Sequence, residues 1–258
     1  MIRNTVIDTL MNRRSVRKYT KQMPTDEEIE TLARAAQQAP FAGQMCSLLL
    51  KKGPKKVPFK APLYFTICVD VHKMECIMKK RGWSTGSCDL SLFLFAVQDA
   101  VLMAENLVIA AESLNMGSCF IGSAPYRAKT IIKEYNLPER VFPIVQLTVG
   151  FPNEDCPTRP RYPLDYFLFE DTYPKFNARQ IKKAMKVMDD GYLAQDYYRG
   201  VNYMVPLEGD REETFTFDNY SWTEHMGRKW GQWIPSPKSL IAALKACGFD
   251  LNMCIDKK

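Results

Sequence analysis

Apolar residues recur at helical spacing in several stretches of the chain, and these stretches predict its helices. Thr25 followed by Glu28 is a capping box, which predicts that a helix begins there. The strongest pattern covers residues 92–115, where apolar side chains lie on more than one side, so this helix should be buried on more than one side. The predicted helices span residues 2–12, 25–39, 92–115, 126–136, 177–190, 222–233 and 237–247.

Three short apolar runs predict strands at residues 47–50, 63–69 and 142–149. Residues 71–90 are expected to be irregular, and residues 118–123 form a short glycine-containing segment. Helices and strands are mixed without a strict β-α-β-α alternation. The phosphate-binding patterns G-x-G-x-x-G and G-x-x-x-x-G-K-[ST] do not occur in the sequence, which argues against a Rossmann domain and a P-loop.

The composition is that of a globular protein. The 258 residues are 46% hydrophobic and 25% charged, and a chain of this length can bury a core without disulfides or metals. A formal net charge of +6 is too small, and the basic residues are too scattered, to argue for nucleic acid. The sequence lacks a run of about 18 apolar residues and an apolar signal core at its N-terminus. We therefore expect no membrane span and a cytoplasmic protein.

The eight cysteines do not indicate a metal site. They include no C-x-x-C pair, and the chain has two histidines, so zinc and iron–sulfur sites are both weakly supported and no metal is expected. Without a secretion signal, disulfides are not expected, and we interpret the cysteines as ordinary buried or half-buried thiols. Cys247 and Cys254 could form a redox pair, although their spacing does not require one.

A dense basic motif, Arg13-Arg14-Ser15-x-Arg17, directly follows the first predicted helix. Three guanidinium groups and a hydroxyl within five residues can bind a phosphate dianion, because arginine offers paired donors and a permanent charge. A solvated basic turn is the alternative interpretation.

A second arginine pair, Arg159 and Arg161, follows the last predicted core strand. The pair lies among three prolines, and a stiffened loop costs less entropy to order around a ligand. Ordinary surface charge is the alternative interpretation.

Two glycine-containing segments could approach a flat ligand. In residues 38–44, small side chains and Gly43 allow close backbone approach, and the Gln44 amide can both donate and accept hydrogen bonds. In residues 117–122, the backbone between two glycines could direct N–H groups at a ligand. The alternative interpretation is that both segments are loops whose glycines have only a structural role.

Taken together and in this order, these motifs resemble the FMN-dependent nitroreductase family over residues 4–168. The ordered set is more specific than any one motif. The matching stretches are Arg13-Arg14-Ser15-Val16-Arg17, Ala35-Ala36-x-x-Ala39-Pro40-x-Ala42-Gly43-Gln44, Gln98-Asp99-Ala100 with Asn106-Leu107, Met116-Gly117-Ser118-Cys119-Phe120-Ile121-Gly122, and Val149-Gly150-Phe151-Pro152 with Arg159-Pro160-Arg161.

The resemblance implies an α+β sandwich with a mainly antiparallel sheet flanked by helices, in an interlocked homodimer with FMN at the interface. The helix at 92–115 would form the dimer core. The FMN phosphate and ribityl chain would be bound by Arg13, Ser15, Arg159 and Arg161, with Arg14 in the same cluster. Arg17 would lie toward the N1/O2 edge of the flavin. The implied cofactor-binding residues are Arg13, Arg14, Ser15, Arg17, Pro40, Phe41, Ala42, Gly43, Gln44, Cys119, Phe120, Ile121, Gly122, Arg159 and Arg161.

Two details of the implied site concern the flavin ring. The partner subunit would supply Pro40 to Gln44 to cover the ring, and Gln44 stands where many members have Asn. The backbone N–H near Ile121 or Gly122 would approach flavin N5. No side chain would be catalytic, because the flavin carries the chemistry.

The implied activity is a ping-pong oxidoreduction, in which NADH or NADPH reduces the flavin and a nitroaromatic, quinone or similar small acceptor reoxidises it. Two alternatives stay open. One is a specialised flavin reaction such as reductive dehalogenation. The other is a flavin-binding or redox-sensing protein without nicotinamide turnover, which the cysteine count and the C-terminal extension would suit.

The sequence predicts two parts, an FMN-binding core at residues 1–168 and a helical extension at residues 169–258 that packs on the core or on the partner subunit. The extension contains three of the four tryptophans, Trp222, Trp230 and Trp233. Their side chains could brace the fold or line an acceptor pocket.

Overall fold

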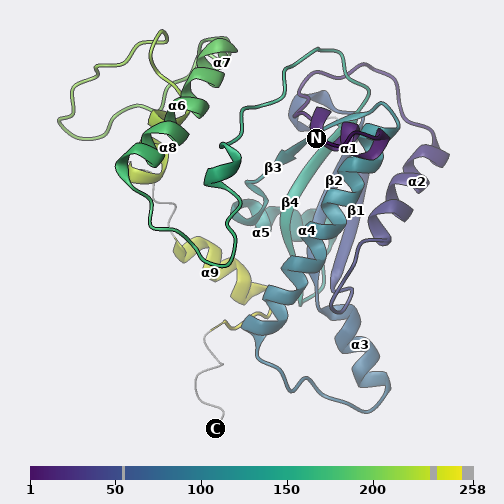
Figure 1. Ribbon diagram of the computed structural model, residues 1–258. Coiled ribbons are helices and arrows are strands. Elements are labelled where there is room, and N and C mark those ends of the chain that lie inside the picture. Colours follow the sequence, from purple (N-terminus) through teal and green to yellow (C-terminus); the bar gives the residue numbers. More distant parts are fainter. Residues whose placement is uncertain (54–55, 233–236, 252–258) are drawn as a thin grey trace. The chain divides into compact units, whose positions relative to one another are not determined.

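A computed structural model of the chain describes residues 1–53, 56–232 and 237–251 (Figure 1). Short 3-10 turns supplement the regular elements. The helices and strands, in chain order, are α1 (Thr5–Asn12), α2 (Asp26–Gln37), β1 (Cys46–Lys52), β2 (Leu63–Asp70), α3 (His72–Lys80), α4 (Asp89–Ser113), β3 (Gly117–Ile121), α5 (Ala128–Tyr135), β4 (Val141–Gly150), α6 (Ala178–Ala194), α7 (Tyr197–Gly200), α8 (Trp222–Gln232) and α9 (Pro237–Ala246).

The predicted elements agree with these bounds to within a few residues, but α3 and the short α7 were not predicted, and the glycine-containing segment at 118–123 contains strand β3. The capping box is confirmed, because Thr25 Oγ1 accepts the N–H of Glu28 and Glu28 Oε2 accepts the N–H of Thr25. The prediction that residues 71–90 are irregular is wrong for α3. This helix starts without a side-chain cap and is nine residues long, so its short apolar stripe of Met74, Ile77 and Met78 was too weak a signal to be found.

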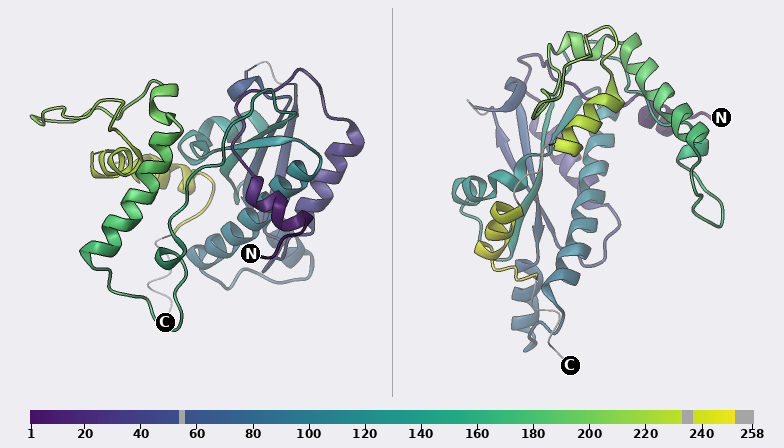
Figure 2. Two further views of the ribbon diagram at one scale, coloured as in Figure 1. Left: turned by 45° about the horizontal axis from the view of Figure 1, so that its top comes forward. Right: turned by 90° about the vertical axis from the view of Figure 1, so that its left-hand side faces the viewer.

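The four strands form one antiparallel sheet in the order β1-β2-β4-β3. All eight residues of β2 are buried, as expected for a central strand covered on both faces. Helices flank the sheet on both sides, as the right-hand view of Figure 2 shows. The predicted α+β class with a mainly antiparallel sheet is confirmed.

Alternate residues of β2 enter two apolar clusters and a polar network. Phe65 and Ile67 pack with Leu147 of β4, and α2 and α4 cover them through Leu32 and Leu107. On the opposite face, polar side chains are paired instead of exposed: the Tyr64 hydroxyl donates to Gln146 Oε1 at 2.7 Å, and Gln146 Nε2 donates to Thr66 Oγ1 at 2.9 Å.

The chain divides into two units that differ from the predicted division. The first contains residues 1–156 and the chain from residue 236 onward, and the second contains residues 157–235. The boundary therefore lies at 156/157 instead of 168/169. Helix α9 belongs to the first unit because Leu244, Cys247 and Phe249 are buried in a cluster with Phe142 of β4.

The second unit contains α6, α7 and α8, and its interior is aromatic. Tyr198 is buried and lies in ring contact with Tyr220 and with His225, the latter at 4.7 Å between ring centroids. The buried guanidinium of Arg228 pairs with Glu213 and Glu224.

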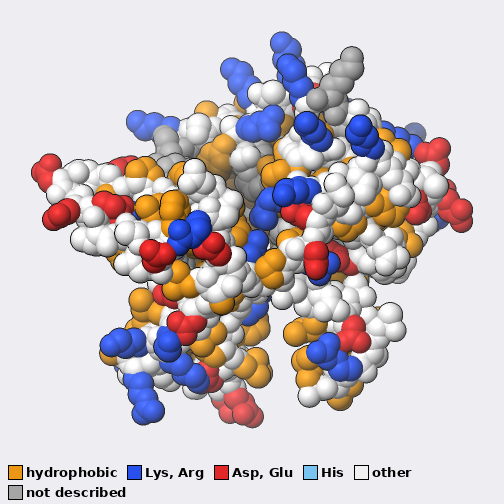
Figure 3. All heavy atoms as spheres, turned by 90° about the horizontal axis from the view of Figure 1, so that it is seen from above, with side chains coloured by type: hydrophobic (Ala, Val, Ile, Leu, Met, Phe, Trp, Pro, Cys, Tyr) orange, Lys and Arg blue, Asp and Glu red, His pale blue; other side chains and the backbone are white. Residues whose placement is uncertain are grey.

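Helix α4 has a buried side and an exposed apolar side. Eight of its residues are buried, yet Leu94 and Val101 are 53% and 47% exposed. Its length and composition would suffice to cross a membrane, but the buried side packs on the sheet and α2, as in the core helix of a globular protein. On the face in Figure 3, apolar side chains lie among both basic and acidic ones.

Six cysteines are free thiols: Cys46, Cys68, Cys76, Cys119, Cys156 and Cys247. Five of them are buried or half-buried as predicted, and Cys76 is exposed. The expectation of no disulfides is wrong for Cys88, which is disulfide-bonded. Cys254, the second member of the suggested redox pair, lies outside the described residues.

Candidate functional site

The arginine turn (Arg13–Arg17) leaves α1 and runs beside β3. The Val16 N–H donates to the Ser118 carbonyl at 2.9 Å, and Ser15 and Ser118 form a parallel bridge. Gly117 permits this approach, since a Cβ there would lie 2.3 Å from Cγ2 of Val16. The structure thus brings two of the predicted cofactor-binding segments, the arginine turn and residues 119–122, side by side.

Acidic side chains hold the backbone of the turn. Glu154 Oε1 accepts the N–H groups of Arg17 and Lys18 at 2.5 and 3.0 Å. Arg14 forms an ion pair of 3.3 Å with Asp155, whose side chain is 94% exposed, so this pair is easily exchanged for another anion. The turn is therefore fixed mainly through its main chain.

Glu112 of α4 lies behind the turn. Burial raises the pKa of its carboxyl group, and the positive charges of Arg13 and Arg14 oppose that rise. Its Oε1 atom is buried without a hydrogen-bond partner among the described residues. One carboxyl group therefore only partly offsets the charge of the arginines in front of it.

Cys119 lies on β3 beside the turn and is buried. Burial raises the pKa of its thiol, against the opposing effects of the Arg17 charge and a hydrogen bond with Ser15. A thiol with a raised pKa stays protonated near neutral pH, so Cys119 is not an activated nucleophile.

Beyond Cys119 the segment is open. Phe120 is 39% exposed, and a Cβ built on Gly122 would meet no atom within 4 Å. A flat group can therefore reach the backbone here. Guanidinium groups, a hydroxyl and open backbone in one place fit a phosphate-bearing flavin such as FMN.

Arg159 and Arg161 belong to the second unit. Arg159 donates to Gln195 Oε1 at 2.6 Å and stacks on the Tyr197 ring at 4.1 Å. Gln195 also donates to the Thr158 carbonyl at 2.8 Å, so its side chain holds both the Arg159 guanidinium and the backbone next to it. Arg161 Nη1 donates to the carbonyls of Arg159 and Pro160, each at 3.0 Å.

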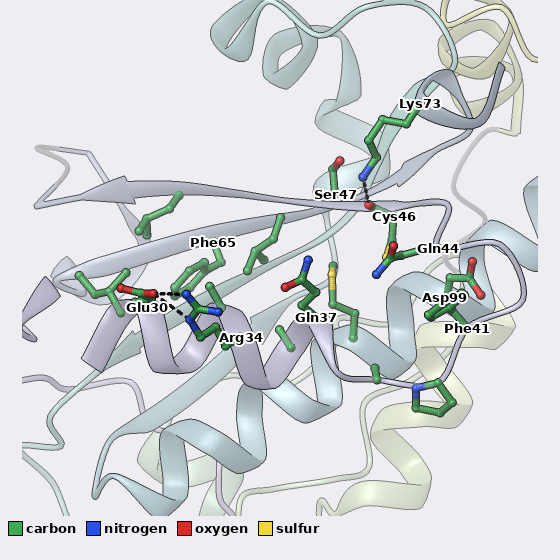
Figure 4. Close-up of a pocket in the computed structure, with 18 residues that line it drawn as sticks. Glu30, Arg34, Gln37, Phe41, Gln44, Cys46, Ser47, Phe65, Lys73 and Asp99 are labelled. Atoms are coloured by element: carbon green, nitrogen blue, oxygen red, sulfur yellow. Dashed lines mark hydrogen bonds and ion pairs between the residues drawn. The ribbon is translucent and has the colours of Figure 1, made fainter. Parts of the chain in front are cut away.

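The 40–45 loop (Pro40–Met45) joins α2 to β1 and borders a pocket of about 600 Å³. We call this space the α2–β1 pocket. The amides of Gln37 and Gln44 both point into it, as Figure 4 shows, and Phe41 stands 57% exposed at its edge. Its remaining wall is made largely of apolar side chains from α2, β1 and β2.

Asp99 of α4 lies inside the curve of this loop (Figure 4). Its carboxylate accepts three backbone N–H groups, from Ala42 at 2.6 Å, Gly43 at 3.1 Å and Met45 at 2.8 Å. Only 2% of the side chain is exposed. In the sequence, an acidic residue in the middle of an apolar helix indicates a carboxylate with partners inside the fold. Its contacts with the backbone of the 40–45 loop were not predicted.

Comparison with known proteins gives a consistent result. The profile of the nitroreductase family matches residues 10–51 and 49–151. The chain is 30% identical to an FMN reductase (NADPH) of Bacillus subtilis over 229 residues, which is 83% of this chain and 89% of the relative. It is 23% identical to an NADPH-flavin oxidoreductase of Vibrio harveyi over 206 residues, which is 74% of this chain and 84% of the relative.

Solved structures show the same fold. The NfrA1 nitroreductase of B. subtilis superimposes with a TM-score of 0.78 at 27% identity, covering 96% of this chain and 100% of that one. NfrA2 of B. megaterium gives a TM-score of 0.80 at 24% identity, covering 96% and 99%. The similarity extends through the second unit as well as the first.

Proposed function

Because the chain belongs to the nitroreductase family, we propose that it works as an FMN-dependent NAD(P)H oxidoreductase, in which bound FMN relays hydride from NADH or NADPH to a nitroaromatic, quinone or similar small acceptor. Its family membership makes it an oxidoreductase. We place it in the cytoplasm. The juxtaposition of the arginine turn with residues 119–122 through the Ser15–Ser118 bridge is the observation that carries this proposal.

Within this proposal the residues divide by the part of FMN they meet. Arg13 and Ser15 bind the phosphate and ribityl chain, and Arg14 reinforces their charge. The same role is proposed for Arg159 and Arg161. Arg17 lies at the N1/O2 edge. Cys119 and Phe120 line the approach, and the backbone N–H of Ile121 or Gly122 donates toward N5.

A homodimer is part of the proposal. Exposed apolar residues on α4, including Leu94, Val101 and Leu102, give a surface that a second copy would bury. Residues Pro40 to Gln44 of that copy would then cover the flavin ring.

A Val101→Asp substitution should shift the protein to a monomer in sedimentation and release flavin with it. Ile77→Asp on α3, a position 55% exposed, is the matched control and should stay dimeric. A Val101→Asp monomer that keeps its flavin would refute the shared site.

The activity is tested on the purified protein under anaerobic conditions. We expect a flavin absorbance that bleaches when NADH or NADPH is added in a stopped-flow instrument and returns when an acceptor follows. A panel of nitroaromatic, quinone and halogenated acceptors separates the general activity from reductive dehalogenation. Bound flavin that neither nicotinamide reduces would refute the proposed activity and favour a flavin-binding protein without turnover.

A further inference from the structure

We propose that Asp99 is a positioning residue, whose buried carboxylate fixes the 40–45 loop in the one shape in which it covers the flavin. This inference rests on the proposed function, because it assumes that the loop of one subunit meets the flavin ring of the other. The geometry that supports it belongs to a single chain.

Three N–H groups converge on the carboxylate within four residues of the loop. Oδ1 accepts from Ala42, and Oδ2 accepts from both Gly43 and Met45. Successive N–H groups that converge on one anion form a concave backbone nest, a shape that a free loop does not hold. Hydrogen bonds to a charged acceptor are stronger than neutral ones, and here they are shielded from water.

The nest explains the unusual backbone conformation of Gln44. This residue has a φ of 52°, in the left-handed region that disfavours residues with a side chain. Gly43 and Met45, its two neighbours, donate to the same oxygen of Asp99, so the chain between them must turn sharply. Such strained residues persist where the surroundings over-determine them, and they cluster at functional sites.

The strained conformation has a directional consequence. It sets the Gln44 amide pointing into the α2–β1 pocket and leaves Phe41 exposed at the edge (Figure 4). Without the clamp, the loop would relax toward right-handed or extended backbone at Gln44. The flavin would then have to order the loop on binding, and that cost lowers affinity.

The first test compares FMN with riboflavin in the full chain. Asp99→Asn keeps the shape but turns one acceptor into an NH₂ donor that faces backbone N–H groups. Because the loop meets the ring common to both ligands, we expect both affinities to fall by the same factor, roughly tenfold. Arg13→Ala should instead weaken FMN alone. Unchanged affinities in Asp99→Asn, or a loss confined to FMN, would overturn the inference.

Two further samples separate positioning from general stability. Asn106 lies on the same helix and donates to the Ala35 carbonyl at 3.1 Å, so Asn106→Ala removes a structural bond outside the loop. This control should leave both flavin affinities within about twofold.

Gln44→Gly makes the left-handed backbone acceptable without the clamp, so Asp99→Asn should cost clearly less affinity in the Gln44→Gly background. An equal cost in both backgrounds would contradict the conformational role.

Hydrogen exchange without flavin tests the clamp independently of the proposed function. Backbone N–H groups of Ala42, Gly43 and Met45 should exchange at least tenfold faster in Asp99→Asn, while those of β2 keep their rates. Unchanged exchange in the loop would overturn the clamp even if flavin binds. If the wild type binds neither flavin but exchange responds as expected, the proposed function fails and the clamp stands. If Asp99→Asn alone does not fold, the double variant with Gln44→Gly is the sample for exchange.

Discussion

The two units of the chain are stabilised by different kinds of interaction. In the first unit, aliphatic residues such as Leu32, Ile67 and Leu107 are fully buried around one sheet. In the second, the buried side chains among the described residues are Ala184, Met188, Tyr198, Tyr220, Ser221 and Arg228. The stability that aliphatic packing gives is lowered mainly when side-chain volume is removed. The stability that aromatic contacts and an ion-paired guanidinium give depends on the geometry of the groups and, for the ion pair, on pH. The units should therefore respond to different perturbations.

The largest effect is expected in the aliphatic core. Leu107→Ala removes a fully buried side chain between α2 and the sheet and should cost about 2–5 kcal/mol of the free energy of unfolding. Three of the four tryptophans lie in residues 157–235, so their fluorescence reports mainly on the second unit. We expect the unfolding midpoint by far-UV circular dichroism to fall more than the midpoint by fluorescence. Equal shifts would show that the units unfold together and would weaken the comparison.

The next effect tests the two proposed phosphate-binding segments, one arginine from each at a time. Each of Arg13→Ala and Arg159→Ala removes a charge-assisted contact of about 1.5–3 kcal/mol, so FMN affinity should fall roughly 10–100-fold. Riboflavin lacks the phosphate, so its affinity should barely change. Fluorescence titration with both ligands measures this.

Arg3 and Arg199 provide the controls, one in each unit. Both are exposed and paired with aspartates, so their Ala variants should bind FMN as the wild type does. If Arg159→Ala kept full FMN affinity while Arg13→Ala lost it, Arg159 would be removed from the proposed phosphate-binding residues.

The sequence predicted the first unit better than the second. Helices with a capping box or a strong apolar stripe, such as α2 and α4, were found within a few residues. Helix α9 was grouped with the rest of the extension, because about 80 residues separate it from the remainder of its unit. Its packing on the core is one of the two arrangements that the sequence analysis allowed. Asp99 was missed because its partners are backbone N–H groups more than 50 residues earlier in the chain, which side-chain patterns do not reveal.

Acid should destabilise the second unit. Hydrogen bonds from Arg228, with one from the Phe215 backbone, lower the pKa of Glu213 from 4.5 to about 2. A lowered carboxyl pKa stabilises the fold above pH 4.5, and this contribution is lost as the pH falls toward 2. Burial lowers the pKa of His225 below 6.5, so its neutral form also favours the fold above that pH and its contribution is lost below it.

Tryptophan fluorescence during acid titration measures this loss. Glu213→Gln should be less stable than the wild type at pH 7, and the difference should shrink as the pH falls from 4.5 to about 2, because Glu213 becomes protonated over this range. The neighbouring exposed Glu212, changed to Gln, is the control and should follow the wild type. A stability difference for Glu213→Gln that is the same at pH 7 and pH 2 would mean that the carboxylate charge does not stabilise the second unit.

The smallest effect on stability separates bracing from binding among the tryptophans. Trp222 makes an edge contact with Tyr162 at 5.6 Å and lies nearly parallel to Tyr192 at 6.4 Å, so Trp222→Ala should destabilise the second unit. Trp230 is 63% exposed, and its Ala variant should change stability by less than about 0.5 kcal/mol. Trp233 lies outside the described residues.

If aromatic side chains of this unit form a wall for a flat acceptor, Trp230→Ala should raise the acceptor KM while flavin reduction by the nicotinamide keeps its rate. Stopped-flow measures the two half-reactions separately. An unchanged acceptor KM in Trp230→Ala, beside a lowered melting temperature in Trp222→Ala, would leave these rings with a bracing role alone.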